Sequence, residues 1–206
     1  MQQGKYRFSE EPFLLKDFIK NKDYKTIVDL GAGCGIISIL LSARFPKSKI
    51  FAIECEEESF QKLETNIQEK EIDNITAVQC WIEDAYKFIA PNTIDLVVCN
   101  PPYFDEKKNR ISPYAQKRLA RFCKTEQLES IIKEAGILLK ERSPFYMCIS
   151  PQRLVDVFIL LRKYHFGVKR LKAIYGSQKK NAFTVLIEST YNTQDNTTME
   201  IPLYTS

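Results

Sequence analysis

The chain has 206 residues, of which 44% are hydrophobic, and a formal net charge of +4. This length suffices for one α/β domain with a substantial core. The six cysteines are scattered and there is a single histidine, which argues against a zinc site. No apolar signal core stands at the N-terminus and no apolar run approaches 18 residues, so we expect a cytoplasmic protein rather than a secreted or membrane protein.

Apolar runs alternate with amphipathic segments along most of the chain. Because strands buried in a parallel sheet appear as continuous apolar runs, we expect strands at 26–30, 49–53, 75–79, 94–99 and 145–150. Helices with one apolar face are expected at 11–22, 35–44, 57–70, 83–89, 125–140 and 151–164.

Two β-rich runs, 168–175 and 182–188, close the pattern. Residues 1–190 are therefore expected to form a single domain, in which residues 1–25 are an N-terminal helical extension. The segment 191–206 is polar and rich in Thr and Asn, and we expect it to be a flexible tail.

A glycine-rich turn follows the first expected strand and opens the next helix, with Gly31, Gly33 and Gly35 at alternate positions. Glycine lets the backbone take positive φ and pass close to a ligand. Glu54 ends the second expected strand, where a carboxylate can accept both hydroxyls of a ribose. The spacing differs from the dinucleotide fingerprint, and the absence of a following Lys-Ser/Thr excludes a P-loop.

Residues 100–103, Asn-Pro-Pro-Tyr, directly follow the fourth expected strand. Two prolines cannot continue a sheet ladder, so the chain must turn there. The turn places the Asn100 amide and the Tyr103 ring beside each other at the edge of the sheet. An amide and an aromatic face together suit a planar amine or amide, such as the exocyclic amino group of adenine.

These motifs resemble those of class I S-adenosylmethionine-dependent methyltransferases that methylate amino groups. Segments 4–15, 100–104, 120–121, 151–154, 169–171 and 182–188 also resemble the bacterial tRNA1(Val) adenine-37 N6-methyltransferases. The resemblance implies a Rossmann-like α/β fold, with a mostly parallel seven-stranded sheet, an antiparallel last strand and helices on both faces. It also implies S-adenosyl-L-methionine as cofactor and the anticodon loop of a tRNA as partner.

The resemblance assigns roles to the residues that match its motifs. Asp29 supports the glycine loop or meets the methionine amine, and Asn100 faces the transferable carbon of the cofactor. The Asn100 side-chain carbonyl and the Pro101 backbone carbonyl are expected to accept the two amino hydrogens of the target adenine. Tyr103 or Phe104 would stack on the base.

The third expected strand departs from the family pattern. Trp81 stands where the family has the acid that contacts the cofactor adenine. Two interpretations remain open, because Asp84 can substitute for that acid or Trp81 can stack on the adenine. A second departure, Phe122-Cys123 after Arg121, concerns the substrate side.

Positive charge is concentrated in two segments. Residues 105–124 carry seven Lys or Arg against two acids, and residues 162–180 carry seven Lys or Arg and no acid. Such segregation favours an anionic partner, and we interpret it as an RNA-binding surface. The candidate RNA contacts are Phe104, Lys107, Lys108, Arg110, Arg121, Lys169, Arg170, Lys179 and Lys180.

Two other functions remain open. Asn-Pro-Pro-Tyr suits a glutamine amide equally well, as in release-factor methyltransferases, although only about 25 residues precede the first strand here. Alternatively, the chain is a non-catalytic RNA-binding module that kept the fold after losing its cofactor, for which Trp81 is the best argument. DNA adenine methylation is less favoured because no target-recognition insertion is visible.

Overall fold

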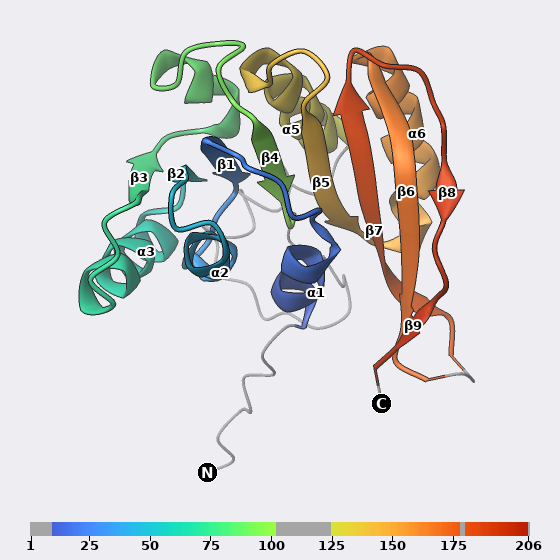
Figure 1. Cartoon of the computed structure of the whole chain (residues 1–206), viewed down its shortest axis with the longest axis horizontal. Coiled ribbons are helices and arrows are strands. Elements are labelled where there is room, and N and C mark those ends of the chain that lie inside the picture. The colour runs from blue at the N-terminus through green and yellow to red at the C-terminus, as the bar shows by residue number, and fades with distance from the viewer. Residues whose placement is uncertain (1–9, 102–124, 178–179, 206) are drawn as a thin grey trace.

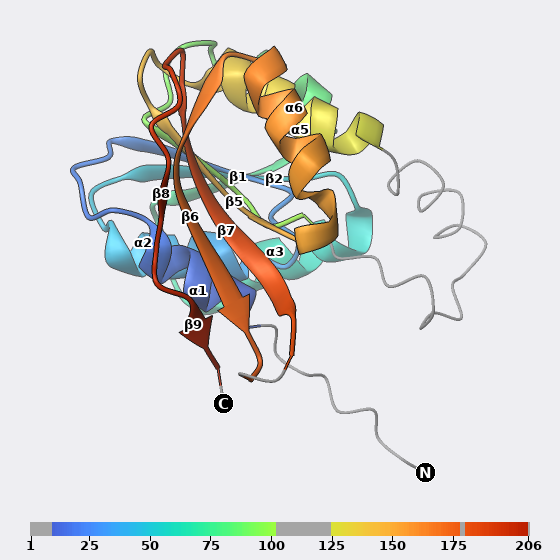
Figure 2. The same ribbon diagram turned by 90° about the vertical axis from the view of Figure 1, so that its right-hand side faces the viewer.

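A mixed β-sheet forms the centre of the molecule, with helices packed against both of its faces (Figures 1 and 2). The computed structural model describes residues 10–101, 125–177 and 180–205. Within these ranges the strands are β1 (Thr26–Leu30), β2 (Lys49–Glu54), β3 (Ile75–Gln79), β4 (Leu96–Cys99), β5 (Pro144–Ile149), β6 (Phe166–Tyr175), β7 (Ala182–Tyr191), β8 (Thr198–Met199) and β9 (Leu203–Tyr204). The helices are α1 (Glu11–Phe18), α2 (Ile36–Arg44), α3 (Glu57–Glu69), α5 (Thr125–Leu138) and α6 (Leu154–Lys163), with 3₁₀ turns η1 (Ile82–Lys87) and η2 (Pro151–Arg153).

The strand order is β3-β2-β1-β4-β5-β7-β6-β8, and β9 also pairs with β6. Strands β1 to β5 are parallel to one another, while β7 runs antiparallel to both β5 and β6. The predicted Rossmann-like arrangement is confirmed. The predicted strand number is corrected, because the described residues contribute nine strands instead of seven.

Two apolar cores, one on each face, hold the layers together. Helices α1, α2 and α3 cover one face and α5 and α6 cover the other, as Figure 2 shows. Strand β1 is buried on both faces, which explains why its sequence is apolar apart from Thr26 at its start and Asp29. None of the helices in the described ranges is both long and apolar enough to cross a membrane.

The C-terminal segment runs along β6, so the expectation of a flexible tail is wrong for its described part. Amide groups of Asn196, Glu200 and Thr205 donate to carbonyl groups of this strand at 3.1, 2.8 and 2.8 Å. Gly167 makes the crossing possible, because a Cβ there would lie 2.3 Å from the Gln194 carbonyl oxygen. The polar composition of the segment hid this pairing, which uses backbone groups and satisfies an otherwise open sheet edge.

Two helix predictions also differ from the structure, and one of them is the helix expected over 11–22, which ends at Phe18. The segment expected as a helix over 83–89 is the 3₁₀ element η1, Ile82–Lys87. Its first residues therefore follow β3 in a tight turn and stay near the carboxyl end of that strand.

Candidate functional site

The glycine turn between β1 and α2 is open at one glycine and closed at another. Gly31, Gly33 and Gly35 have φ of +76°, +58° and +86°, values that favour glycine. A Cβ on Gly35 would lie 2.4 Å from Cδ1 of the buried Leu63, whereas a Cβ on Gly33 would meet no atom of the described residues within 4 Å. A side chain at position 35 would therefore force the buried Leu63 to shift, whereas Gly33 leaves room for a ligand to approach the backbone.

Glu54 joins the second motif to the first. Its Oε2 accepts a hydrogen bond from the Gly33 amide at 2.8 Å. Its Oε1 accepts from the amides of Cys55 and Glu56 at 2.9 and 2.8 Å. These three donors fix the carboxylate at the carboxyl ends of β1 and β2. A carboxylate has about four lone-pair sites, so capacity remains for a hydroxyl of a ligand.

Asp29 and Asn100 present unsatisfied acceptors on neighbouring strands. The buried Asp29 accepts a hydrogen bond from Ser38 Oγ at 2.7 Å through Oδ2. Its Oδ1, like Oδ1 of Asn100, is buried and has no hydrogen-bond partner among the residues that the structure describes. Desolvation by burial raises the Asp29 pKa to about 7. Because buried polar atoms normally have partners, these two oxygens indicate a place where ligand donors can bind.

A pocket of about 210 Å³ lies beyond β3 and bears on the two interpretations of Trp81. Trp81 lines it and is 41% exposed, whereas Asp84 is not among its lining residues and pairs with Lys87 at 2.6 Å. The structure thus favours Trp81 over Asp84 as the pocket wall. The other residues that line the pocket are Cys55, Ile82, Glu83, Glu126, Gln127 and Ser130.

Glu83 also lines this pocket, and it was not among the candidate site residues predicted from the sequence. It is the first acid after β3, and that position was the only signal that could have identified it.

A larger hollow of about 800 Å³ lies at the opposite sheet edge, beside His165 and Asn192, away from the motifs. Of the predicted site residues, it contains Lys169.

The second basic segment is largely neutralised by acids from elsewhere in the chain. Three of its ion pairs are Arg162 with Asp195 at 2.5 Å, Lys163 with Glu129 at 2.6 Å, and Lys172 with Glu200 at 3.4 Å. Lys169 donates a hydrogen bond to the Gln194 carbonyl. The expectation of a free, strongly positive surface over 162–180 is therefore not supported, because partners distant in sequence offset the charge.

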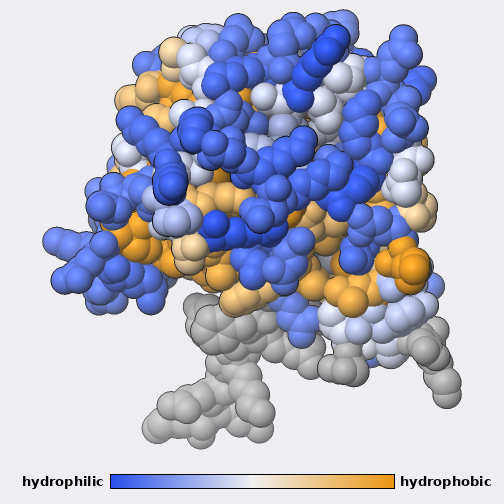
Figure 3. Space-filling model, in the orientation of Figure 1, coloured by the Kyte–Doolittle hydropathy of each residue, from blue (hydrophilic) through white to orange (hydrophobic). Residues whose placement is uncertain are grey.

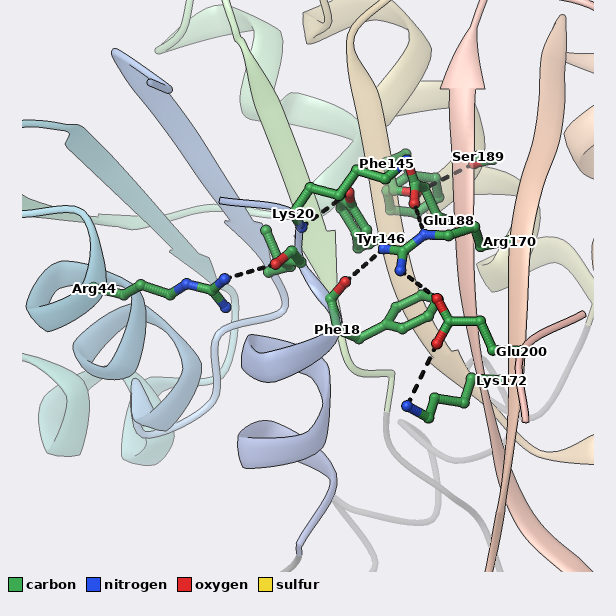
Figure 4. Close-up of polar contacts among 11 residues, drawn as sticks. Phe18, Lys20, Arg44, Phe145, Tyr146, Arg170, Lys172, Glu188, Ser189 and Glu200 are labelled. Carbon is green, nitrogen blue, oxygen red and sulfur yellow. Dashed lines mark hydrogen bonds and ion pairs between the residues drawn. The ribbon is translucent and has the colours of Figure 1, made fainter. Parts of the chain in front are cut away.

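Arg170 lies at the centre of an internal network (Figure 4). Its guanidinium pairs with Glu188, with Glu200 at 2.5 Å, and with the Phe18 carbonyl at 2.6 Å. Lys20 pairs with the same buried Glu188 at 2.8 Å. These contacts connect α1, β6, β7 and the C-terminal segment, so we remove Arg170 from the candidate RNA contacts.

Several predicted site residues lie outside the described residues. These are Tyr103, Phe104, Lys107, Lys108, Arg110, Arg121 and Lys179. Pro101 is described and buried, and Lys180 is exposed near the β6–β7 connection. The motif residues that the structure does describe, from Asp29 to Asn100, follow or end neighbouring parallel strands and share one sheet edge.

Comparisons with known proteins agree with this arrangement. The model of the methyltransferase small domain family matches residues 11–142. A Flavobacterium psychrophilum protein named tRNA1(Val) (adenine(37)-N6)-methyltransferase is 28% identical over 173 residues, covering 81% of this chain and 72% of the relative. A Pedobacter heparinus protein of the same name is 23% identical and covers 91% and 79%.

Solved structures support the fold. A predicted O-methyltransferase from Agrobacterium tumefaciens has a TM-score of 0.74 at 17% identity, covering 94% of this chain and 86% of the other. A putative methyltransferase from Streptococcus mutans, solved with SAH, has a TM-score of 0.59 at 16% identity, with coverage of 87% and 95%. The family match spans more than half of the chain and includes the glycine turn, Glu54 and Asn100. The chain therefore belongs to the methyltransferase small domain family and is an S-adenosyl-L-methionine-dependent methyltransferase.

Proposed function

We propose that this protein transfers a methyl group to the exocyclic N6 of an adenine in RNA, with adenine 37 in the anticodon loop of valine tRNA as the target. The observation that carries the proposal is the buried, unpaired Oδ1 of Asn100 at the same sheet edge as the open Gly33. The names of the bacterial relatives support the choice of substrate.

The described residues fit the cofactor. The open backbone at Gly33 gives it room, Glu54 would accept a hydrogen bond from one of its ribose hydroxyls, and Asp29 Oδ1 is an available acceptor for its amine. Trp81 and Glu83 would bind its adenine, the ring by stacking and the exocyclic amino group by accepting a hydrogen. When bound, S-adenosyl-L-methionine supplies an activated methyl group on a sulfonium.

The protein's contribution to the reaction would be alignment of the target nitrogen. The Asn100 side-chain carbonyl and the Pro101 backbone carbonyl would each accept one amino hydrogen of the adenine. This leaves the nitrogen lone pair directed at the methyl carbon, and no side chain needs to act as a strong base. Correct orientation can lower a barrier by about 7–11 kcal/mol in favourable cases. Tyr103 and Phe104 remain the proposed stacking partners.

Glutamine-amide methylation is the principal competitor, since an Asn-Pro-Pro-Tyr turn suits that group too. A non-catalytic module is less consistent with the site, because without a ligand the buried acceptors of Asp29 and Asn100 would stay unpaired, which is energetically costly.

The deciding experiment incubates the protein with methyl-labelled cofactor and unmodified valine tRNA, then maps the labelled nucleoside. We expect N6-methyladenosine at position 37, and no label when adenine 37 is replaced by guanosine. Label found in protein alone would reject the RNA substrate in favour of the glutamine amide. Calorimetric titration with the cofactor tests the non-catalytic alternative, which requires that no binding be detected.

A further inference from the structure

A group of aromatic side chains stands at the end of the β6–β7 pair, beyond the strand ends that carry the proposed site. Tyr175 ends β6 and faces Tyr204 of β9 in the strand register. Their ring centroids are 5.3 Å apart with planes at 30°. Tyr204 lies in the C-terminal segment, and 47% of its surface is exposed.

Phe183 occupies an irregularity in the same pair of strands. Ile174 pairs with Thr184 and Tyr175 pairs with Ala182, so Phe183 is an extra residue on β7. Such bulges re-aim a side chain and are frequent at sheet edges and beside active sites. Phe183 is 37% exposed, whereas the neighbouring Thr184 is fully buried.

The strand registers relate this group to Asn100. Cys99 pairs with Met147 on β5, and Ile149, two residues further, pairs with Val185 on β7. Phe183 therefore lies two strands to the side of Asn100, or roughly 10 Å, and about three residues or roughly 10 Å beyond it along the strands. A separation of this size corresponds to a few stacked nucleotides.

The chemistry of the surface favours unpaired nucleotides. Aromatic side chains stack on bases without regard to sequence, and adjacent cations hold phosphates. Lys180 is exposed in the same β6–β7 connection. Figure 3 shows apolar surface on the lower right of the molecule, on the side where Figure 1 places β8 and β9, and Met199, Ile201 and Leu203 of this segment are exposed.

We propose that Phe183, Tyr175 and Tyr204 form a second stacking surface that binds unpaired nucleotides flanking the target adenine in the RNA loop. The inference rests on the proposed function and extends it by assigning the substrate contacts of the C-terminal segment. Under this assignment β9 completes the substrate side of the site, because Tyr204 supplies one of the rings.

The test compares Phe183→Leu, Tyr204→Leu and the double variant with Phe88→Leu, a matched control. Phe88 is 59% exposed and follows η1, away from the β6–β7 end of the sheet. The probe is an RNA hairpin with a seven-nucleotide loop containing the target adenine, and its Kd is measured by fluorescence anisotropy. Cofactor Kd is measured by calorimetry, and folding is checked by thermal unfolding.

We expect each single variant to raise the Kd for the hairpin about 5- to 150-fold, the range given by loss of one base–aromatic stack. The turnover number at saturating RNA and the cofactor Kd should stay close to wild type, and Phe88→Leu should change nothing. Tyr204→Phe should bind within twofold of wild type, because it keeps the ring. A duplex RNA without a loop should bind all variants equally.

The possible failures are distinguishable. If wild type methylates the hairpin and the folded double variant binds it within twofold of wild type, the stacking surface is refuted and the proposed function stands. If wild type binds cofactor but neither binds nor methylates RNA, both proposals fall. A loss in Tyr204→Phe equal to that in Tyr204→Leu would assign the effect to the hydroxyl and also refute stacking.

Discussion

The glycine turn offers a matched pair of substitutions that separate packing from ligand binding. Gly33→Ala and Gly35→Ala add the same methyl group two residues apart, both at positive φ. A non-glycine residue in this region costs about 1–2 kcal/mol of backbone strain. Only Gly35 adds a collision, since its Cβ would lie 2.4 Å from Leu63 Cδ1 in the core.

Overpacking of this kind costs about 1–3 kcal/mol beyond the strain, because a buried leucine has little room to move. We therefore expect Gly35→Ala to be less stable than Gly33→Ala by about 2 kcal/mol. For a domain of this size the difference corresponds to about 4–8 °C in Tm. Urea unfolding and thermal scans without cofactor measure it directly.

Cofactor binding should show the opposite ranking. The methyl group of Gly33→Ala would occupy the open space over the turn, and we expect the cofactor Kd to rise at least about tenfold, the equivalent of about 1.4 kcal/mol. Gly35→Ala, measured under conditions where it is folded, should bind more nearly as wild type does. Equal stability losses, or wild-type cofactor affinity in Gly33→Ala, would refute our assignment of the open and closed glycines.

Three further expectations follow from individual side chains. Because burial raises the Asp29 pKa from 3.8 to about 7, the folded state holds an extra proton between these values. The contribution of this proton to the free energy of unfolding is full below pH 3.8 and is lost as the pH rises to about 7. In urea unfolding over this pH range, wild type should therefore lose of order 4 kcal/mol of that free energy relative to Asp29→Asn. Parallel pH profiles of the two proteins would contradict this expectation. Asn100→Ala should abolish turnover while calorimetry shows nearly unchanged cofactor affinity, and a large loss of that affinity would mean that the side chain is misassigned. Arg170→Ala should lower the free energy of unfolding by up to about 3 kcal/mol, because the buried Glu188 would keep only Lys20 as its cationic partner, and the RNA affinity of the folded protein should not change. An RNA-specific loss would restore Arg170 to the binding surface.

Much of the proposed site was predictable from local sequence. A parallel strand buried on both faces must be a continuous apolar run, and a glycine turn or a double proline must end it. Since parallel strands expose their carboxyl ends at one edge, the convergence of Gly33, Glu54 and Asn100 followed from strand order alone. The hydrogen bond from the Gly33 amide to Glu54 shows that two of these motifs are in contact.

Choices between adjacent side chains required the structure. Trp81 and Asp84 are three residues apart, and the sequence left both as candidates for the cofactor adenine. The tight η1 turn places Trp81 in the pocket wall and directs Asp84 to Lys87, a result of local geometry that residue type does not reveal.

The sequence by itself determined the methyltransferase fold and the edge of the sheet at which we propose that the chemistry takes place, because both depend on periodicity and on backbone constraints encoded within a few residues. Only the tertiary structure decided which charges are free and what the C-terminal segment does. Arg170 meets Glu188 and Glu200 from 18 and 30 residues away, and Tyr204 reaches Tyr175 by pairing along an open strand edge. Contacts of this kind are set by which strands become neighbours, and no local pattern of charge or polarity contains that information.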